Sequence, residues 1–88
     1  MKTDFAKQFD KDVNKINNAT ILDRIEQAIV IVEEARILRE IPELKKLKGY
    51  RIYYRIKIGR YRIGVTIEGD LVTFARVLPR KDFYKYFP

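Results

Sequence analysis

The chain has 88 residues, of which 47% are hydrophobic and 35% charged, with a net charge of +7. This size and composition predict one globular domain over residues 1–88 and exclude a disordered chain. The absence of cysteine and histidine excludes a disulfide framework, a cysteine-based metal site and the usual general acid–base side chain. Without a secretory signal or a segment that could cross a bilayer, the sequence predicts a cytoplasmic protein with no membrane contact.

Two helices are predicted in the first half of the chain. Apolar residues recur at helical spacing from Phe5 to Ile16, and a longer apolar stripe runs from Ile21 to Leu38. Asn18 or Thr20 can cap the second helix, and Pro42 is expected to end it because the residue before a proline disfavours the helical conformation. The short break between the helices predicts an antiparallel hairpin.

The next part of the chain is rich in positive charge. Glu43 to Gly49 is expected to be a connecting segment, anchored to the core by Leu44 and Leu47. No residue from Lys45 to Ile67 is acidic. Such a block favours polyanions, nucleic acid first and an anionic membrane second. The alternative is a solvated basic surface, but here the charges alternate with core residues instead of clustering in a tail.

A strand with one buried and one cationic face is predicted to end at Ile58. Its two faces alternate along the chain, with Ile52, Tyr54, Ile56 and Ile58 on one and Arg51, Tyr53, Arg55 and Lys57 on the other. A two-residue turn at Gly59-Arg60 then pairs Lys57 with Arg62 in the next strand. Like charges directly opposite destabilise a sheet, so we expect this face to bind an anion.

A second tight turn, at Gly69-Asp70, predicts a third strand from Leu71 to Leu78. This register places Arg76 opposite Ile63 on the buried face. An arginine there needs an edge position or a carboxylate partner, because a buried unpaired charge is costly.

The end of the chain can fold back onto the cationic face. Pro79 ends the third strand, and an aromatic and basic tail follows from Arg80 to Pro88, with room for one helical turn. Gly64 beside Ala75 would leave a shallow trough on this face. The candidate site residues are expected around it, and they are Tyr53, Arg55, Lys57, Arg62, Arg80 and Tyr84.

This set of side chains suits RNA. Guanidinium and ammonium groups hold phosphates, and tyrosine rings stack on splayed bases. The sequence shows no paired carboxylates, nucleophilic triad or phosphate-binding loop. RNA can still be cleaved if its own 2′-hydroxyl attacks the phosphate. Arginines would then stabilise the added charge, and a lysine or tyrosine would accept the proton.

Several spaced motifs in the second half of the chain point to a family. They are Gly49-Tyr50, Tyr54 to Gly59, Tyr61-Arg62-Ile63, Arg76-Val77-Leu78 and Arg80 to Tyr84. With the two preceding helices and the Lys-Lys-Leu-Lys-Gly connector, they resemble the RelE/ParE superfamily of toxins from type II toxin–antitoxin systems. The resemblance implies an α+β fold in which an N-terminal helical hairpin packs on a small antiparallel β-sheet.

The resemblance also implies site residues and partners. The positions that match the family's cleavage residues are Arg55, Lys57, Arg62, Arg80 and Tyr84. We expect further RNA contacts from the basic and aromatic residues Lys45, Lys46, Lys48, Arg51, Tyr53 and Lys81. Two departures bear on proton transfer: Arg55 stands where lysine is common, and Pro79 where many members have histidine. The expected partners are mRNA, the ribosome and an acidic, partly disordered antitoxin, with no metal and no small-molecule cofactor.

Three functions follow from this reading. The first is a RelE-like, metal-independent endoribonuclease (an mRNA interferase), in which Arg55, Arg62 and Arg80 clamp the scissile phosphate. Lys57 or Tyr84 would be the general base, and the product would carry a 2′,3′-cyclic phosphate. The alternatives are a ParE-like DNA gyrase inhibitor without nuclease activity and an inactive RNA-binding domain. The retained cleavage set argues against the gyrase inhibitor.

Overall fold

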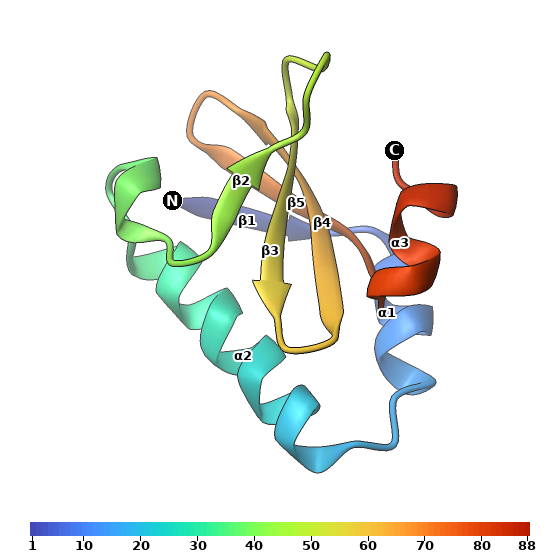
Figure 1. Cartoon of the computed structure of the whole chain (residues 1–88). Helices are drawn as coiled ribbons and strands as arrows, with labels where there is room; N and C mark the ends of the chain where they lie inside the picture. The colour runs from blue at the N-terminus through green and yellow to red at the C-terminus, as the bar shows by residue number, and fades with distance from the viewer.

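The protein is organised around one five-stranded sheet, seen in a computed structural model that describes residues 1–88 (Figure 1). The strands are β1 (Lys2–Phe5), β2 (Leu44–Lys46), β3 (Tyr53–Ile58), β4 (Tyr61–Glu68) and β5 (Leu71–Pro79). Their order in the sheet is β1-β5-β4-β3-β2, with β1 parallel to β5 and all other neighbours antiparallel. The predicted α+β class is confirmed, and the sheet is mixed because of β1.

The two edge strands were not predicted. Phe5 fitted the helical stripe, but it lies in β1, where it pairs with Phe74 and stacks on its ring with the centroids 5.2 Å apart. Lys45 and Lys46 were assigned to a connecting segment, but they lie in β2 and pair with β3. Both strands are short, three or four residues, and too charged to show an alternating pattern.

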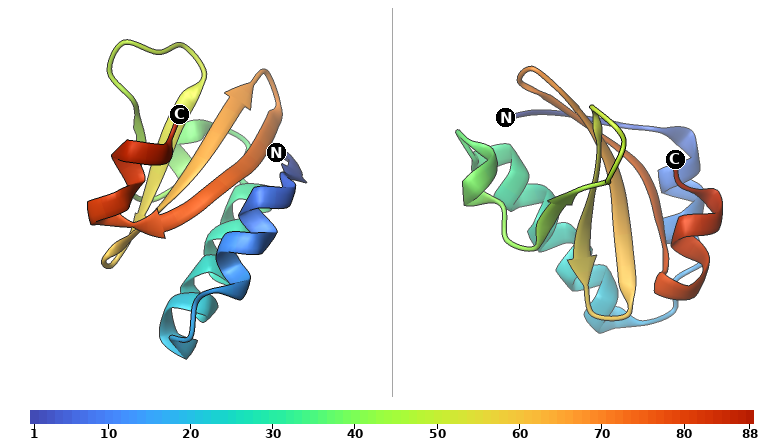
Figure 2. Two further views of the ribbon diagram at one scale, coloured as in Figure 1. Left: turned by 90° about the vertical axis from the view of Figure 1, so that its right-hand side faces the viewer. Right: turned by 45° about the horizontal axis from the view of Figure 1, so that its top comes forward.

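The helices are α1 (Lys7–Asn14), α2 (Ala19–Glu34) and α3 (Arg80–Tyr86), with a 3-10 helix over Leu38–Glu40. The Asn18 side chain caps α2 as predicted, accepting a hydrogen bond from the Ile21 amide at 3.1 Å. The prediction that Pro42 ends this helix is wrong, because the backbone already becomes extended at Ala35 and α2 ends at Glu34. Figure 2 shows α1 and α2 running in opposite directions, as the hairpin prediction required. None of the helices is both long and apolar enough to span a membrane.

The hydrophobic core lies between α2 and one face of the sheet. Ile25 and Val32 from α2 pack into one cluster with buried sheet residues such as Ile63 and Phe74. The opposite face was predicted to be open, but α3 covers part of it (Figure 2). A Cβ atom on Gly64 would lie only 2.8 Å from the Phe87 ring, so Phe87 fills the predicted trough.

The predicted register of β3 against β4 is confirmed in full, including Lys57 opposite Arg62. The register of β4 against β5 is confirmed only as far as Val65 opposite Phe74. A β-bulge follows, with Ala75 as the extra residue, so Arg76 lies opposite Gly64 and not Ile63. A bulge changes the face on which each later residue lies. Arg76 is therefore removed from the core side.

Candidate functional site

A groove of about 990 Å³ lies between the β3–β4 turn and the start of α3. Five of the nine lining residues are cationic and none is acidic, and these five are Lys57, Arg60, Arg62, Arg80 and Lys81. The other four are Gly59, Tyr61, Pro79 and Tyr84. The groove thus brings together Lys57, Arg62, Arg80 and Tyr84, four of the five residues predicted to be catalytic.

Backbone pairing positions the two walls of the groove. Tyr61, the first residue of β4, lies opposite Pro79, the last residue of β5. Directly after this pair, the Arg80 amide donates a hydrogen bond of 2.7 Å to the Arg60 carbonyl. The first residue of α3 is therefore fixed to the β3–β4 turn, which places the Arg80 side chain beside the cations of the sheet.

Arg62 is the cation whose position is most tightly fixed. Its side chain was predicted on an open face, but the residue is only 7% exposed. Its Nη1 donates to the carbonyls of Gly59 and Tyr61, both at 2.9 Å. No buried side-chain nitrogen or oxygen lacks a partner, and Arg62 lines the groove. Carbonyls orient the guanidinium without cancelling its charge, which leaves it available to an anion.

No carboxylate neutralises the groove. The protein contains two ion pairs, Arg36–Glu40 and Asp12–Arg76, and none of these four residues lines the groove. No group of three or more aspartate, glutamate, histidine or cysteine side chains gathers anywhere in the structure to hold a metal ion. Unpaired cations on low-dielectric walls focus a positive potential, so the groove is suited to binding a phosphate-bearing ligand.

Arg55 and Tyr53 lie on the same face but outside this groove. The Arg55 Nη1 donates to the Glu43 carbonyl at 2.8 Å. The ring of Tyr53 meets Phe87 and Tyr50 edge-on, with centroids 5.5 and 5.4 Å away. Because Tyr53 is held in this aromatic cluster, the Tyr84 ring is the better stacking surface, and Tyr84 is 58% exposed.

The other predicted RNA contacts fall into two places. Lys81 lines the groove, whereas four exposed basic residues lie in and after β2, beside β3 and before its start, and they are Lys45, Lys46, Lys48 and Arg51. Sequence reasoning missed Arg60 and Tyr61 as groove residues. Arg60 was assigned only to the turn, although a cation at the tip of a cationic hairpin could have suggested a role.

Comparison with known proteins shows the family of the chain. The family model described as the ParE toxin of the type II toxin–antitoxin system parDE matches residues 4–84. Toxin RelE3 of Methanocaldococcus jannaschii is 44% identical over 89 residues, covering all of both chains. The chain belongs to the RelE/ParE superfamily of type II toxins.

Solved structures of this superfamily have the same fold. The RelB–RelE antitoxin–toxin complex from Methanococcus jannaschii matches with a TM-score of 0.81 and 42% identity, covering 97% of this chain and 99% of that chain. The archaeal RelE–RelB complex from Pyrococcus horikoshii matches with a TM-score of 0.72 and 22% identity, covering 90% and 93%. The second likeness shows the fold alone. Toxin RelE3 and the RelB–RelE complex from Methanococcus jannaschii, 44% and 42% identical to this chain, together show that it is a type II toxin of the RelE type.

Proposed function

We propose that this RelE-type toxin is an endoribonuclease that cleaves mRNA on the ribosome, in the cytoplasm, and so blocks translation. The observation that carries the proposal is the groove, with its five cations, no acidic group and an exposed tyrosine. A phosphodiester that gains charge in the transition state needs such a cluster.

The proposed reaction is a displacement at phosphorus by the RNA's own 2′-hydroxyl. The 2′-oxygen forms a bond to phosphorus while the bond to the 5′-oxygen breaks, which leaves a 2′,3′-cyclic phosphate and a free 5′-hydroxyl. Arg62 and Arg80 hold the non-bridging oxygens, and the carbonyl contacts of Arg62 keep its guanidinium oriented before the substrate arrives. Either Lys57 or Tyr84 accepts the 2′-hydroxyl proton, and the other donates a proton to the departing 5′-oxygen.

The groove offers no side chain of the kind that holds a divalent cation. Its lining contains no carboxylate, imidazole or thiolate. We therefore propose that the cations of the groove supply the charge stabilisation that a bound metal ion supplies in other nucleases, and that the reaction is metal-independent.

The RNA is proposed to run along β3 away from the groove. Arg55 and Lys57 are two residues apart on one face, which separates them by about 7 Å along the strand. That spacing is close to one nucleotide, so Arg55 would hold the phosphate next to the scissile one. Further RNA contacts would come from the exposed cations beside β3 and before its start, which are Lys45, Lys46, Lys48 and Arg51.

An antitoxin is the second proposed partner. Two of the related structures are complexes between RelE and RelB, described as antitoxin–toxin or RelE–RelB complexes. We propose that this toxin also binds a cognate antitoxin, acidic and partly disordered, that covers the groove. An uncovered surface of net charge +7 would bind RNA without selectivity.

Inhibition of DNA gyrase remains the second candidate, because the matching family model is described as a ParE toxin. The test is to induce the toxin in cells, map mRNA 5′ ends and assay gyrase supercoiling in parallel. We expect new mRNA ends and unchanged supercoiling. Arg62→Ala or Arg80→Ala should each reduce cleavage about 100- to 1,000-fold, the effect of losing one oxyanion-type donor. The matched control is Arg36→Ala, an exposed arginine outside the groove. Full cleavage by a folded Arg62→Ala/Arg80→Ala variant would refute the assignment.

A further inference from the structure

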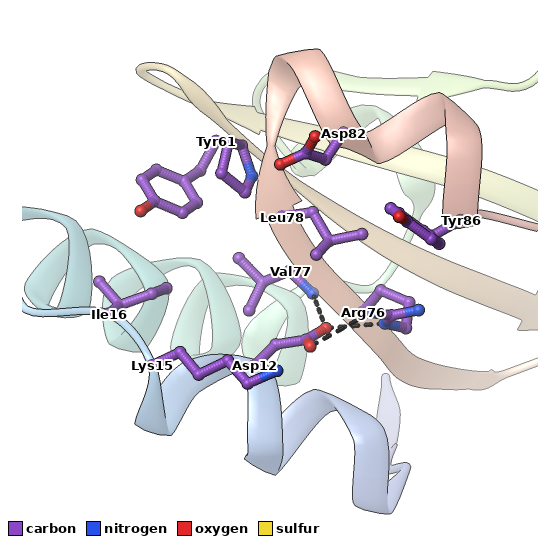
Figure 3. Close-up of a pocket in the computed structure, with 10 residues that line it drawn as sticks. Asp12, Lys15, Ile16, Tyr61, Arg76, Val77, Leu78, Asp82 and Tyr86 are labelled. Carbon is purple, nitrogen blue, oxygen red and sulfur yellow. Dashed lines mark hydrogen bonds and ion pairs between the residues drawn. The ribbon is translucent and has the colours of Figure 1, made fainter.

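The buried ion pair of this protein joins α1 to the end of β5. Asp12 is 3% exposed, and it accepts hydrogen bonds from the Arg76 Nε at 2.8 Å and the Arg76 Nη2 at 3.2 Å (Figure 3). The same carboxylate accepts from the Val77 amide at 3.1 Å and from the Gln8 side chain at 3.1 Å. All its partners are donors, so the carboxylate is fully satisfied and its orientation is fixed.

Asp12 lies where β5 loses its neighbour. β1 pairs with β5 only as far as Phe74, and the edge of β5 is free beyond that point. The Val77 amide on this free edge would otherwise have no backbone partner, and Asp12 supplies one. The bulge at Ala75 has turned Arg76 out of the core, so that it too can reach Asp12. The ion pair therefore holds the bulged register of β5.

Arg76 also contacts the helix that carries three of the groove residues. Its guanidinium carbon lies 5.9 Å from the centre of the Tyr86 ring, which is on α3. Figure 3 shows Arg76 between Asp12 on α1 and Tyr86 on α3. The three side chains line a cleft of about 490 Å³, and Tyr61 and Pro79 line both this cleft and the groove. Tyr61 and Pro79 thus form a wall between the ion pair and the groove.

The position of α3 depends on such contacts. It has seven residues, and an isolated helix of that length is not stable in water. Three features fix it to the sheet: the Arg80 amide bond to Arg60, the burial of Phe83 and Phe87, and the contact between Tyr86 and Arg76. Of these three, only the contact between Tyr86 and Arg76 links α3 to α1, because Arg76 also pairs with Asp12.

We propose that Asp12 and Arg76 are positioning residues, whose ion pair holds the end of β5 and α3 so that Arg80 and Tyr84 face the groove. Neither residue lines the groove, so neither touches the scissile phosphate. The consequence is that α1, a helix remote from the reaction, controls the geometry of the groove. The catalytic part of this inference rests on the proposed function, whereas the positioning of α3 does not.

The test measures α3 directly. In the isosteric Asp12→Asn variant, hydrogen exchange should accelerate about tenfold at amides of α3. The same is expected for the amide of Phe87, the residue that caps α3, which donates to the Phe83 carbonyl at 2.9 Å. Exchange at β4 amides such as Ile63 should change less, after correction for global stability. Arg76→Lys keeps the charge without the bidentate geometry, so exchange at the α3 amides should accelerate less than in Asp12→Asn. Glu40→Gln, which removes the exposed ion pair, should change neither set of amides.

Cleavage supplies the second measurement. In Asp12→Asn, kcat for mRNA bound to ribosomes should fall about 10- to 100-fold, because a misplacement of about 1 Å costs that much. KM should stay within about twofold, since all five groove cations remain. Tyr86→Leu should lower kcat as well. In the double variant with Asp12→Asn, kcat should fall by less than the product of the two single reductions.

Two outcomes would overturn the inference. In the first, Asp12→Asn reduces protection from hydrogen exchange equally at the α3 and β4 amides. The ion pair would then stabilise the whole protein and would not position α3. The other is an equal loss of kcat and RNA affinity. A wild-type protein that cleaves no mRNA on ribosomes, but whose α3 still loosens in the variant, would refute the endoribonuclease and leave the positioning role standing.

Discussion

Gly64→Ala tests how closely α3 is packed on the sheet. An added Cβ would lie 2.8–2.9 Å from three carbons of the Phe87 ring, a separation that real Cβ atoms essentially never show. Phe87 is 6% exposed, so the ring must shift within a packed site or leave it. Shifting it costs about 1–3 kcal/mol through overpacking, and full exposure of a phenylalanine costs about 1.5–3 kcal/mol.

A second term acts in the opposite direction. Glycine inside a strand is less stable than alanine by about 0.5–1 kcal/mol, because it loses more backbone entropy on folding. The net expectation is a loss of about 1–2 kcal/mol in the free energy of unfolding. Because α3 also carries Tyr84, cleavage should fall as well.

The assay is urea unfolding followed by far-UV circular dichroism, in a double-mutant cycle with Phe87→Ala. With the ring removed, the steric cost disappears and only the entropic gain remains. Gly64→Ala should therefore become neutral or stabilising in the Phe87→Ala background. Destabilisation of equal size in both backgrounds would show that the ring is not the cause and would refute the packing argument.

Three further predictions concern charge. Burial acts to raise the pKa of Asp12, but hydrogen bonds from Arg76, Gln8 and the Val77 amide bring that pKa below its ordinary value of 3.8. Its stabilising effect is therefore fully present above that value and lost as the pH falls through the folded pKa, so the difference in unfolding free energy between wild type and Asp12→Asn should stay constant above about pH 5 and shrink as the pH falls below 3.8. Arg60→Ala should lower the slope of log K against log salt for single-stranded RNA by about 0.7, measured by fluorescence anisotropy, whereas an unchanged slope would place Arg60 away from phosphate. In stopped-flow experiments, association with the antitoxin should slow as salt rises and slow further in Lys57→Glu, and a salt-independent rate shared by both proteins would exclude the groove from capture.

The sequence predicted the part of the site that depends on strand alternation. The pairing of β3 with β4 followed from a two-residue turn and one alternating face, so Lys57 and Arg62 were placed together correctly. The prediction failed at Ala75 because the alternating pattern contains no signal for a bulge. The buried carboxylate on α1 is what stabilises the bulged register, through Arg76 and Val77.

The closure of the cationic face could not be predicted either. The tail was expected to fold back, but its helix and the contact of Phe87 with Gly64 depend on tertiary packing. The same packing removed Tyr53 from the set of freely accessible rings. The low exposure of Arg62 was not predicted either. Residue types were thus predicted better than their exposure, because exposure depends on which segments cover the sheet.

The parallel pairing of β1 with β5 has a consequence for the order of folding. Strands β3, β4 and β5 are joined by tight turns and pair with their neighbours in sequence, whereas Lys2 pairs with Leu71 across most of the chain. Closing so long a loop costs more entropy than closing a hairpin, and such contacts form slowly. We therefore expect the β3–β5 meander to assemble first and the segment from β1 to α1 to dock last. Asp12 belongs to that segment. The walls of the groove would therefore form before the ion pair between Asp12 and Arg76 that aligns them.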